Sequence, residues 1–401
     1  MSNKKNKPLM PKLRFPAFRN SPEWISEKVD RLVDTITPPK KLPTSSYAVN
    51  GDFPIIDQSQ NAICGWTDDR EALIKDDLPL IIFGDHTCIL KLLDRPFAQG
   101  ADGIKILKPR PRIGTSYLYQ YLSYRPVVTE EYKRHYSILK EKVVLFPDFK
   151  TGEQQKIADC LSSLDELIVA QARKVDALKT HKKGLMQQLF PREGETQPRL
   201  RFLEFRDAGE WEDQSIGNIG KVVTGSTPST AQPAFYGGGI PFVSPADISD
   251  MRFVDQTKTT LTQEGYAQTR PIRAGSVLFV CIGSTIGKVA QNIRDCATNQ
   301  QINAIIPNSK HSEGFVYFAL SLASERIALL AGRQAVPIIN KSLFSSVRIL
   351  VPKLPEQHRI ASFLSSIETL LTDENQSLEL LKAHKKGLMQ QIFPSLESIS
   401  A

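Results

Sequence analysis

The amino-acid sequence lacks any window of about 18 apolar residues, so no membrane-spanning helix is expected. Its N-terminal residues are basic and are not followed by an apolar stretch, which is not the pattern of a secretory signal. Cysteine is scarce: there are five, an odd number, and no two stand in a C-x-x-C spacing. Free or buried thiols in a reducing cytoplasm are therefore expected.

Motifs that bind cofactors or metals are also missing. No G-x-x-x-x-G-K-[ST] loop occurs, and TGSTPST at Thr224 lacks the lysine. None of the six histidines lies two to five residues from a cysteine, so no metal-ligand spacing is present. The N-P-P-[FYW] and D-P-P-[FYW] tetrapeptides of amino-methyltransferases are absent, and Pro147-Asp148 does not extend into a nuclease motif. We expect no catalytic site, no metal and no cofactor in this chain.

The composition is that of a folded, mildly basic protein. The 401 residues are enough for two or three domains of ordinary size. Apolar residues make up 41% and charged residues 23%, which allows a buried core and is not typical of disorder. The net charge of +8 and the isoelectric point near 9.1 weakly indicate an acidic partner such as nucleic acid.

The sequence is internally repeated. Residues 153–191 and 356–394 align without a gap at an offset of 203, with 20 of 39 positions identical and HKKGLMQQ in both copies. LRFPAF and LRFLEF match more faintly at an offset of 187, and IIFGDHT and VCIGSTI at 199. An offset that only grows along the chain indicates one duplicated unit with insertions in the second copy.

Each copy of the strongest repeat has the spacing of a coiled-coil helix. Between flanking prolines, its apolar residues recur alternately three and four residues apart. A helix over about residues 154–188 would be about 52 Å long at 1.5 Å per residue, long enough to separate two globular domains. The alternative is an ordinary pair of core helices in one globule.

Polar residues interrupt the apolar seam of each helix twice, at Gln171 and Lys182 and at Glu374 and Lys385. One register of an antiparallel pair places Lys182 opposite Glu374, so that opposite charges meet. The same register places Gln171 opposite Lys385, an amide beside an ammonium group. This register is a hypothesis, and finding Lys182 and Glu374 in different layers would contradict it.

The segments outside the helices, residues 25–145 and 212–350, mix short apolar runs with helical stretches. Runs such as LPLIIFG, ILKLL, VVLF, SVLFVCIG and INAIIP predict strands, and helices are expected near residues 117–124 and 313–330. We therefore expect an α+β (mixed α/β) fold. Two globular domains, each with a small twisted sheet, would be separated by two long antiparallel coiled-coil helices in an internal pseudo-two-fold repeat.

Polar residues follow the predicted strands at matched places in both halves. Base edges are read by side chains with paired donors and acceptors, whereas phosphates are held by Lys, Arg, Ser, Thr and backbone amides. The candidates for DNA contact are Gln58, Ser59, Gln60, His86, Thr87, Gln99, Lys105, Ser244, Asp247, Ser284, Thr285, Lys288, Asn299, Gln300 and Gln301. The candidates for partner docking or helix pairing are Lys183, Lys386, Gln171, Lys182, Glu374 and Lys385. The competing interpretation is that each DNA candidate only caps a turn and that the KKG runs form a solvated face.

The motifs together resemble one known family. LRFPAF…EW, GDHT with PFAQGADGIKIL, TGSTPS…IPFVSPADI, GSVLFVCIGSTIGKVA, ATNQQINAII and the KKGLMQQ helix ends are similar to the specificity subunits of type I restriction–modification systems. The resemblance covers nearly the whole chain. The expected parts are a first target recognition domain (1–152), a first spacer helix (153–191), a linker (192–211), a second target recognition domain (212–352), a second spacer helix (353–394) and a tail (395–401).

The resemblance implies a non-catalytic subunit in a bacterial or archaeal cytoplasm, with no membrane contact. Its two domains would read the two halves of an asymmetric site on double-stranded DNA. Its helices would dock two adenine methyltransferase subunits and, through them, two restriction subunits. S-adenosylmethionine, ATP and Mg are then expected only in those partners.

Three other functions remain open at this point. A stand-alone DNA-binding regulator would bind its site tightly without partners. An enzyme acting on DNA would need cofactor or metal motifs that the sequence lacks. A pure coiled-coil scaffold would have no use for the two large variable segments.

Overall fold

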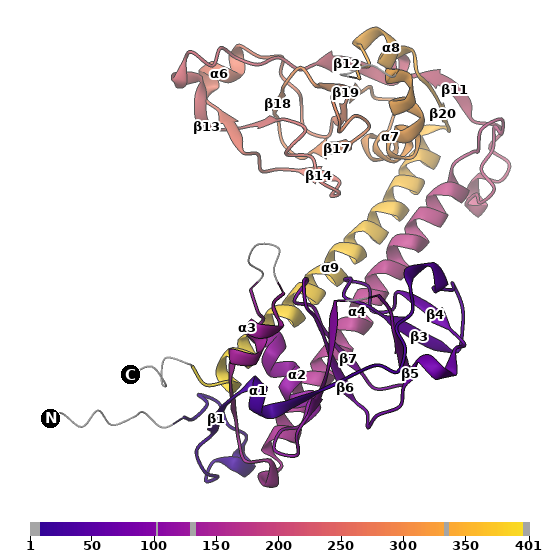
Figure 1. Ribbon diagram of the computed structural model, residues 1–401. Coiled ribbons are helices and arrows are strands. Elements are labelled where there is room, and N and C mark those ends of the chain that lie inside the picture. The colour runs from indigo at the N-terminus through magenta and orange to yellow at the C-terminus, as the bar shows by residue number, and fades with distance from the viewer. Residues whose placement is uncertain (1–8, 102, 129–133, 333–336, 396–401) are drawn as a thin grey trace. The chain divides into compact units, whose positions relative to one another are not determined.

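Two compact units make up the chain (Figure 1), one comprising residues 1–173 and 376–401 and the other residues 174–375. Both boundaries fall inside the long helices α4 (Glu153–Leu189) and α9 (Leu354–Ile392). Each unit therefore combines one variable segment with part of each long helix. The computed structural model describes residues 9–101, 103–128, 134–332 and 337–395.

The first unit contains three small sheets, with strand orders β1-β10, β2-β9-β6-β7 and β4-β3-β8-β5. The strands are β1 (Ile25–Lys28), β2 (Val33–Ile36), β3 (Phe53–Ile56), β4 (Gly65–Thr67), β5 (Leu73–Ile74), β6 (Leu80–Gly84), β7 (Leu90–Leu93), β8 (Phe97–Gln99), β9 (Ile104–Pro109) and β10 (Val143–Phe146). The short helices are α1 (Val29–Leu32), α2 (Thr115–Tyr124) and α3 (Tyr136–Glu141).

The second unit also contains three sheets, with orders β11-β20, β12-β19-β16-β17-β14 and β15-β13-β18. The strands are β11 (Glu212–Ser215), β12 (Gly220–Thr224), β13 (Tyr236–Val243), β14 (Phe253–Val254), β15 (Thr259–Leu261), β16 (Val277–Val280), β17 (Val289–Asn292), β18 (Ala297–Thr298), β19 (Ile302–Pro307) and β20 (Arg348–Val351). The helices are α5 (Ile216–Ile219), α6 (Gln263–Ala267), α7 (Glu313–Ala328) and α8 (Lys341–Ser346).

The two units repeat one arrangement. The order β2-β9-β6-β7 of the first unit corresponds to β12-β19-β16-β17 of the second, which adds β14 at the edge. The parallel pair β3 and β8 corresponds to the parallel pair β13 and β18. The α+β fold with two long helices and an internal repeat is thus confirmed, and the predicted helices near 117–124 and 313–330 are α2 and α7.

The expectation of one small sheet per domain was wrong, because the described residues of each unit form three. In the first unit, β3 and β8 pair with each other in parallel instead of joining the antiparallel sheet of β6 and β9. Short apolar runs predict strands but carry no information about which strands pair. The parallel pairs matter for function, since parallel strands end at the same edge of their sheet.

Aromatic residues at the end of a long helix complete the core of each unit. In the first unit Phe393, just after α9, contacts Tyr117 and Tyr121 of α2 with ring centroids 5.9 and 5.2 Å apart. In the second unit Phe190, just after α4, stacks on Phe315 of α7 at 5.3 Å. These side chains are almost fully buried, and burial of each large aromatic is worth about 1.5–3 kcal/mol.

One helix, α7 together with the turn that follows it (Glu313–Ala331), is long and apolar enough to cross a membrane by length and composition alone. Its side chains Phe315, Phe318 and Leu320 are fully buried in the core of the second unit. This burial is what a core helix of a globular domain shows.

Candidate nucleic-acid interface

Three loops of the first unit meet where β3, β6 and β8 end. The backbone N–H of His86 donates to Oε1 of Gln58 at 3.3 Å, and the hydroxyl of Thr87 donates to the Gln58 carbonyl at 2.7 Å. Gly103, after β8, has a φ of +103°, and a Cβ there would lie 2.5 Å from Nε2 of Gln58. The structure therefore brings Gln58, His86 and Thr87 together, as their places after neighbouring strands suggested.

The other candidates of the first unit differ in exposure. Gln60 is exposed, whereas Ser59 is half-buried and its hydroxyl lies 3.1 Å from Sγ of Cys64. Gln99 is only 3% exposed, because it is the last residue of β8 and lies inside the sheet. Lys105 lies on β9, with its Nζ 5.4 Å from the centre of the Tyr136 ring. Gln60 is thus the most available to a ligand, and Gln99 the least.

The equivalent loops of the second unit also meet. The backbone N–H of Asn299 donates to the carbonyl of Val243 at 3.1 Å, and that of Cys281 donates to the carbonyl of Gln301 at 2.7 Å. These bonds join the loops that follow β13, β16 and β18. The hydroxyl of Thr227, in the TGSTPST loop, reaches Oε1 of Gln300 at 2.6 Å. Four loops therefore form one continuous polar edge.

Several candidates of this edge satisfy local partners. Asp247 accepts from the hydroxyl and the backbone N–H of Ser244 at 2.6 and 2.9 Å. Asn299 donates to Gln301 at 3.0 Å, and Lys288 donates to the Ile248 carbonyl at 2.9 Å. The side chains that face solvent are those of Ser284, Lys288 and Gln300, whereas Thr285 is half-buried. The local bonds shape the loops, and Lys288 and Gln300 are exposed although each also takes part in one of these bonds.

The long helices pair antiparallel, but the polar pairs proposed from the sequence were wrong. Lys182 bonds to Glu368 at 2.6 Å, and Glu374 bonds to Lys174 at 2.7 Å, so Lys182 and Glu374 are not partners. Lys385 likewise bonds to Asp165 at 2.6 Å, where Gln171 had been proposed. The partner of Lys182 lies six residues before Glu374 on α9.

The observed pairs are two copies of one salt bridge. Asp165 and Glu368 are equivalent at the 203-residue offset of the repeat, and so are Lys182 and Lys385. The lysines are 22% and 14% exposed, since the aliphatic part of each chain follows the seam while its ammonium reaches a carboxylate on the neighbouring helix. Lys183 and Lys386, the adjacent lysines, are exposed and so available to a partner.

Two short segments, strap 1 (residues 9–24) and strap 2 (residues 196–211), hold the helix ends. Strap 1 places Arg14 in a two-bonded ion pair with Glu153, at 2.8 and 2.6 Å. Strap 2 places Arg201 on Glu356 in the same way, at 2.8 and 2.7 Å. The side chains are 9% exposed or less. The repeated LRF motif showed that the straps correspond, but their role in anchoring the helices is visible only in the structure.

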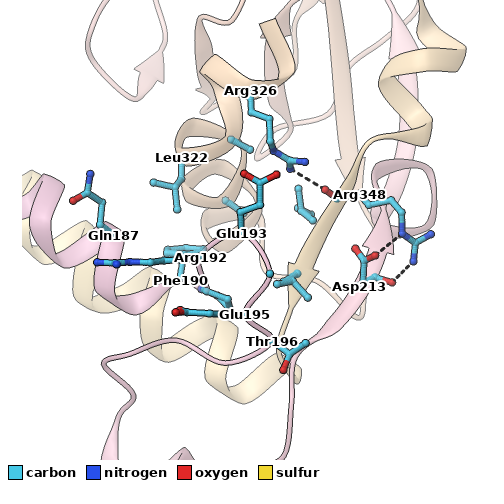
Figure 2. A pocket seen from close by; sticks show the side chains of 16 residues that line it. Gln187, Phe190, Arg192, Glu193, Glu195, Thr196, Asp213, Leu322, Arg326 and Arg348 are labelled. Atoms are coloured by element: carbon cyan, nitrogen blue, oxygen red, sulfur yellow. Dashed lines mark hydrogen bonds and ion pairs between the residues drawn. The ribbon is translucent and has the colours of Figure 1, made fainter. Parts of the chain in front are cut away.

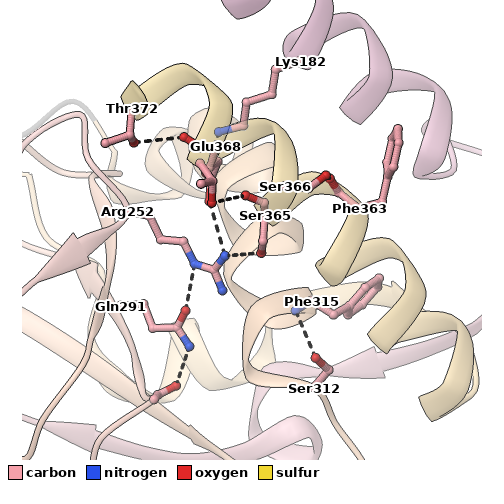
Figure 3. Close-up of polar contacts among 12 residues, drawn as sticks. Lys182, Arg252, Gln291, Ser312, Phe315, Phe363, Ser365, Ser366, Glu368 and Thr372 are labelled. Carbon is pink, nitrogen blue, oxygen red and sulfur yellow. Dashed lines mark hydrogen bonds and ion pairs between the residues drawn. The ribbon is translucent and has the colours of Figure 1, made fainter. Parts of the chain in front are cut away.

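Arg252 ties the second recognition segment to α9 (Figure 3). Its guanidinium donates to Ser365 at 2.7 Å, to Glu368 at 3.3 Å and to Gln291 at 2.9 Å. It also lies 4.7–4.9 Å from the ring centres of Phe253, Tyr317 and Phe318. Sequence analysis missed this residue because it lies where the repeat offset rises from 187 to 199, in an insertion that the first copy lacks.

We expect Arg252→Met to lower the free energy of unfolding of the second unit by about 3 kcal/mol, because the change leaves the buried face of Glu368 less well paired and removes three cation–π contacts. Hydrogen exchange of residues 174–375 measures the loss. Arg294→Met, which removes an exposed pair with Asp255, is the control and should cost less than about 1 kcal/mol. Equal losses in the two variants would show that Arg252 does not anchor this segment.

A pocket of about 800 Å³ lies beside the end of α4 (Figure 2). Gln187 lines it from the helix and Phe190 from just after it, Leu322 and Arg326 from α7, and Arg348 from β20. Arg348 is held by Asp213 at 2.6 Å. The walls thus mix apolar side chains with both signs of charge.

The thiols and potential metal ligands give no sign of chemistry. Burial raises the pKa of Cys281 and of Cys296 to about 12, so neither is a thiolate near neutral pH. All five cysteines are free. Within the residues that the structure describes, no three His, Cys, Asp or Glu side chains gather as metal ligands would.

Comparison with known proteins gives one consistent result. Residues 208–383 match the family model described as the type I restriction modification DNA specificity domain. The HindI specificity subunit of Haemophilus influenzae is 34% identical over 147 residues, which is 35% of this chain and 32% of that protein. The EcoR124I/EcoR124II specificity subunit of Escherichia coli is 28% identical over 81% of this chain and 82% of that protein.

Solved structures show the same fold. The type I specificity subunit from M. genitalium superimposes with a TM-score of 0.66 at 17% identity, over 96% of this chain and all of that one. A chain from a study of complex assembly and conformational transition of the type I restriction–modification system gives 0.53 at 15% identity, over 93% of this chain and 98% of that one.

Two repeated α+β units thus each combine a polar loop edge with part of an antiparallel helix pair. Residues 208–383 carry the DNA specificity domain of type I restriction–modification systems, and most of the chain is similar to the specificity subunits of those systems. The names of its relatives and the description of the family model assign a specificity role, not a catalytic one. The two relatives named above come from bacteria, and the MjaIX specificity subunit, which is 27% identical over 47% of this chain and 45% of that protein, comes from Methanocaldococcus jannaschii.

Proposed function

We propose that this chain reads an asymmetric, bipartite site on double-stranded DNA, one half with each unit, and that it docks two adenine methyltransferase subunits through its helices. S-adenosylmethionine belongs to those subunits, and ATP with Mg belongs to restriction subunits that join through them. The complex works in the cytoplasm. The single observation that carries the proposal is the duplication of the polar loop edge in two units of different sequence.

Base reading is supported by the make-up of the two edges. Each presents amide and hydroxyl side chains from loops that follow neighbouring strands, with Gln58 and Gln60 in the first unit and Gln300 in the second. Glutamine can donate to and accept from a base in the major groove at once. Because the two edges share a scaffold and differ in side chains, the half-sites they read need not be related by symmetry.

Docking of two identical partners is supported by the exposed faces of the helices. Leu167 of α4 is 55% exposed and Leu370 of α9 is 42% exposed, and the two are equivalent at the 203-residue offset. Each lies next to an exposed polar residue, Glu166 and Thr369 respectively. An apolar side chain repeated at equivalent positions gives each partner copy the same contact.

The helix length supports a fixed gap between the half-sites. With 37 residues at 1.5 Å each, α4 is about 55 Å long. Half-sites one DNA turn apart are about 34 Å from centre to centre. A spacer helix of this length can cover that distance, and adding or removing helical turns should change the gap and leave the half-sites unchanged.

Methylation mapping tests the proposal. The chain is expressed with its methyltransferase subunit in a host without other adenine methylation, and methylated adenines are located by long-read sequencing. We expect one bipartite motif with a fixed gap, absent when this chain is omitted. Replacing residues 25–145 with the same segment of another family member should change one half of the motif only.

The result that would contradict the proposal is methylation that does not depend on this chain. If the purified chain then still bound one DNA sequence tightly, it would be a stand-alone reader, and the docking role of the helices would be abandoned.

A further inference from the structure

Equivalent grooves occur in the two units, beside β2 in the first and β12 in the second. The first groove has a volume of about 470 Å³ and the second about 540 Å³. β2 pairs with β9, and β12 with β19, in the same register. The segment on the other side of each groove is also paired antiparallel. In the first unit Ile74 of β5 pairs with Phe97 of β8, and in the second Ile272 pairs with Cys296, just before β18.

The groove of the first unit carries acids, and nearby cations are already neutralised. Asp76 and Asp77 line it, and both bond to Lys108, with Nζ 3.1 Å from Asp77 and closer still to Asp76. Asp34, on β2, holds Arg110 at 2.8 Å. Hydrogen bonds from these partners lower the pKa of Asp34 and of Asp76, so both are charged near neutral pH. Lys75 also lines this groove, but it adjoins Asp76 and Asp77, so the described residues of the lining have no surplus positive charge to hold a phosphate.

The groove of the second unit reverses this charge. Its lining includes Lys221, Arg270 and Lys341, and no acidic side chain is among the described residues that line it. Lys221 stands on β12 at the position that Asp34 occupies on β2, at the 187-residue offset. Ile272 corresponds to Ile74. Two and three residues further along, where the first unit has Asp76 and Asp77, the second unit has Ala274 and Gly275.

The cationic groove adjoins the polar loop edge. The backbone N–H of Arg270 donates to the Ser226 hydroxyl at 3.1 Å, and its guanidinium donates to the Thr224 carbonyl at 2.9 Å. The backbone N–H of Ser226 in turn donates to the Thr298 carbonyl at 2.9 Å, one residue before Asn299. A DNA backbone that passes the loop edge therefore passes the groove as well.

We propose that Lys221, Arg270 and Lys341 bind phosphates of the DNA backbone, and that the equivalent groove of the first unit is not a phosphate-binding site. The inference rests on the proposed function, which makes DNA the ligand of the loop edge. Uncompensated lysines and arginine in a concave site are the groups that hold phosphates, and such contacts add affinity without adding sequence preference. The second unit thus supplies more of the salt-dependent binding, although both units read bases.

The salt dependence of DNA binding tests the inference. The complex of the full chain with its methyltransferase subunits is titrated onto a labelled duplex from 50 to 250 mM KCl. Each lost phosphate contact flattens the slope of log K against log salt by about 0.9. We expect the variant with Lys221→Gln and Lys341→Gln to have a slope flatter by about 2, with an unchanged methylation motif. Arg270 is kept because it also holds the Thr224 carbonyl.

Lys75→Gln is the matched control, because Lys75 is the one lysine among the described residues that line the equivalent groove of the first unit. The salt dependence of DNA binding by this variant should have the same slope as that of the unmodified complex. An unchanged slope in the double variant would overturn the inference. So would loss of methyltransferase binding with an unchanged slope, since the groove would then hold an acidic protein surface.

Counterion release does not depend on sequence, so the slope is also measured on a duplex without the motif. A complex with no sequence preference would contradict the proposed bipartite reading. The slope on either duplex would still decide whether the groove binds phosphates.

Discussion

Replacing Arg201 with methionine is expected to lower the free energy of unfolding of the second unit by about 3–5 kcal/mol. The guanidinium makes two bonds to Glu356 at 2.8 and 2.7 Å and a third to the Gly209 carbonyl at 2.7 Å. The side chains of Arg201 and Glu356 are 9% and 2% exposed. Methionine fills similar space but leaves a buried carboxylate without a partner, which costs more than the lost attraction alone.

Hydrogen exchange measures this loss unit by unit, with a control two residues away. Arg199 bonds to Glu195 at 3.0 Å with side chains 52% and 36% exposed, so Arg199→Met should cost less than about 1 kcal/mol. Arg14→Met should cause a loss as large as that of Arg201→Met, confined to residues 1–173 and 376–401. Equal effects of Arg199→Met and Arg201→Met would refute the anchoring role of strap 2.

Reversing one charge in the helix pair is expected to destabilise the first unit, and reversing its partner should restore much of the loss. Lys385→Glu sets a second carboxylate beside Asp165, which now lies 2.6 Å from the ammonium. The side chains of Lys385 and Asp165 are 14% and 39% exposed. We therefore expect the free energy of unfolding of the first unit to fall by about 2 kcal/mol, less than for a fully buried pair. Adding Asp165→Lys should recover about half, because the pair is re-formed in the opposite sense.

This double variant separates the observed pairing from the one in which Lys385 faces Gln171. In that alternative Asp165→Lys would give no recovery from Lys385→Glu. The equivalent exchange in the second unit serves as a contrast: Glu368→Lys should fail to rescue Lys182→Glu, since it places a lysine beside Arg252, which is 3.3 Å from Glu368. Thermal unfolding of the four variants gives the comparison.

Much of the fold could be predicted because it depends on local patterns. The 203-residue repeat and its heptads define two long helices, and apolar runs such as those of β6 and β16 define strands. The polar pairs between the helices could not be predicted, because a lysine side chain is long enough to reach a carboxylate in a neighbouring layer, so Lys182 needed no acid directly opposite.

The candidate site was predictable in its location and less so in its residues. Loops after neighbouring strands converge whatever their sequence, which is why Gln58, His86 and Thr87 come together. Exposure depends on tertiary packing, and nothing local shows that Gln99 is buried while Gln60 faces solvent. Arg252 lies 113 residues from Ser365, and a contact so distant in sequence leaves no periodic signal.

The division of the chain has a consequence for its synthesis on the ribosome. The second unit is continuous, residues 174–375, and has all its parts once these have emerged. The first unit is interrupted: the core around Trp24 and Tyr117 also needs Met389, Ile392 and Phe393, which are translated more than 200 residues later. The segment that is translated first therefore completes its fold last, in contrast to the usual order in which domains finish from the N-terminus. Until then the part of its apolar core that Met389, Ile392 and Phe393 cover stays open to solvent.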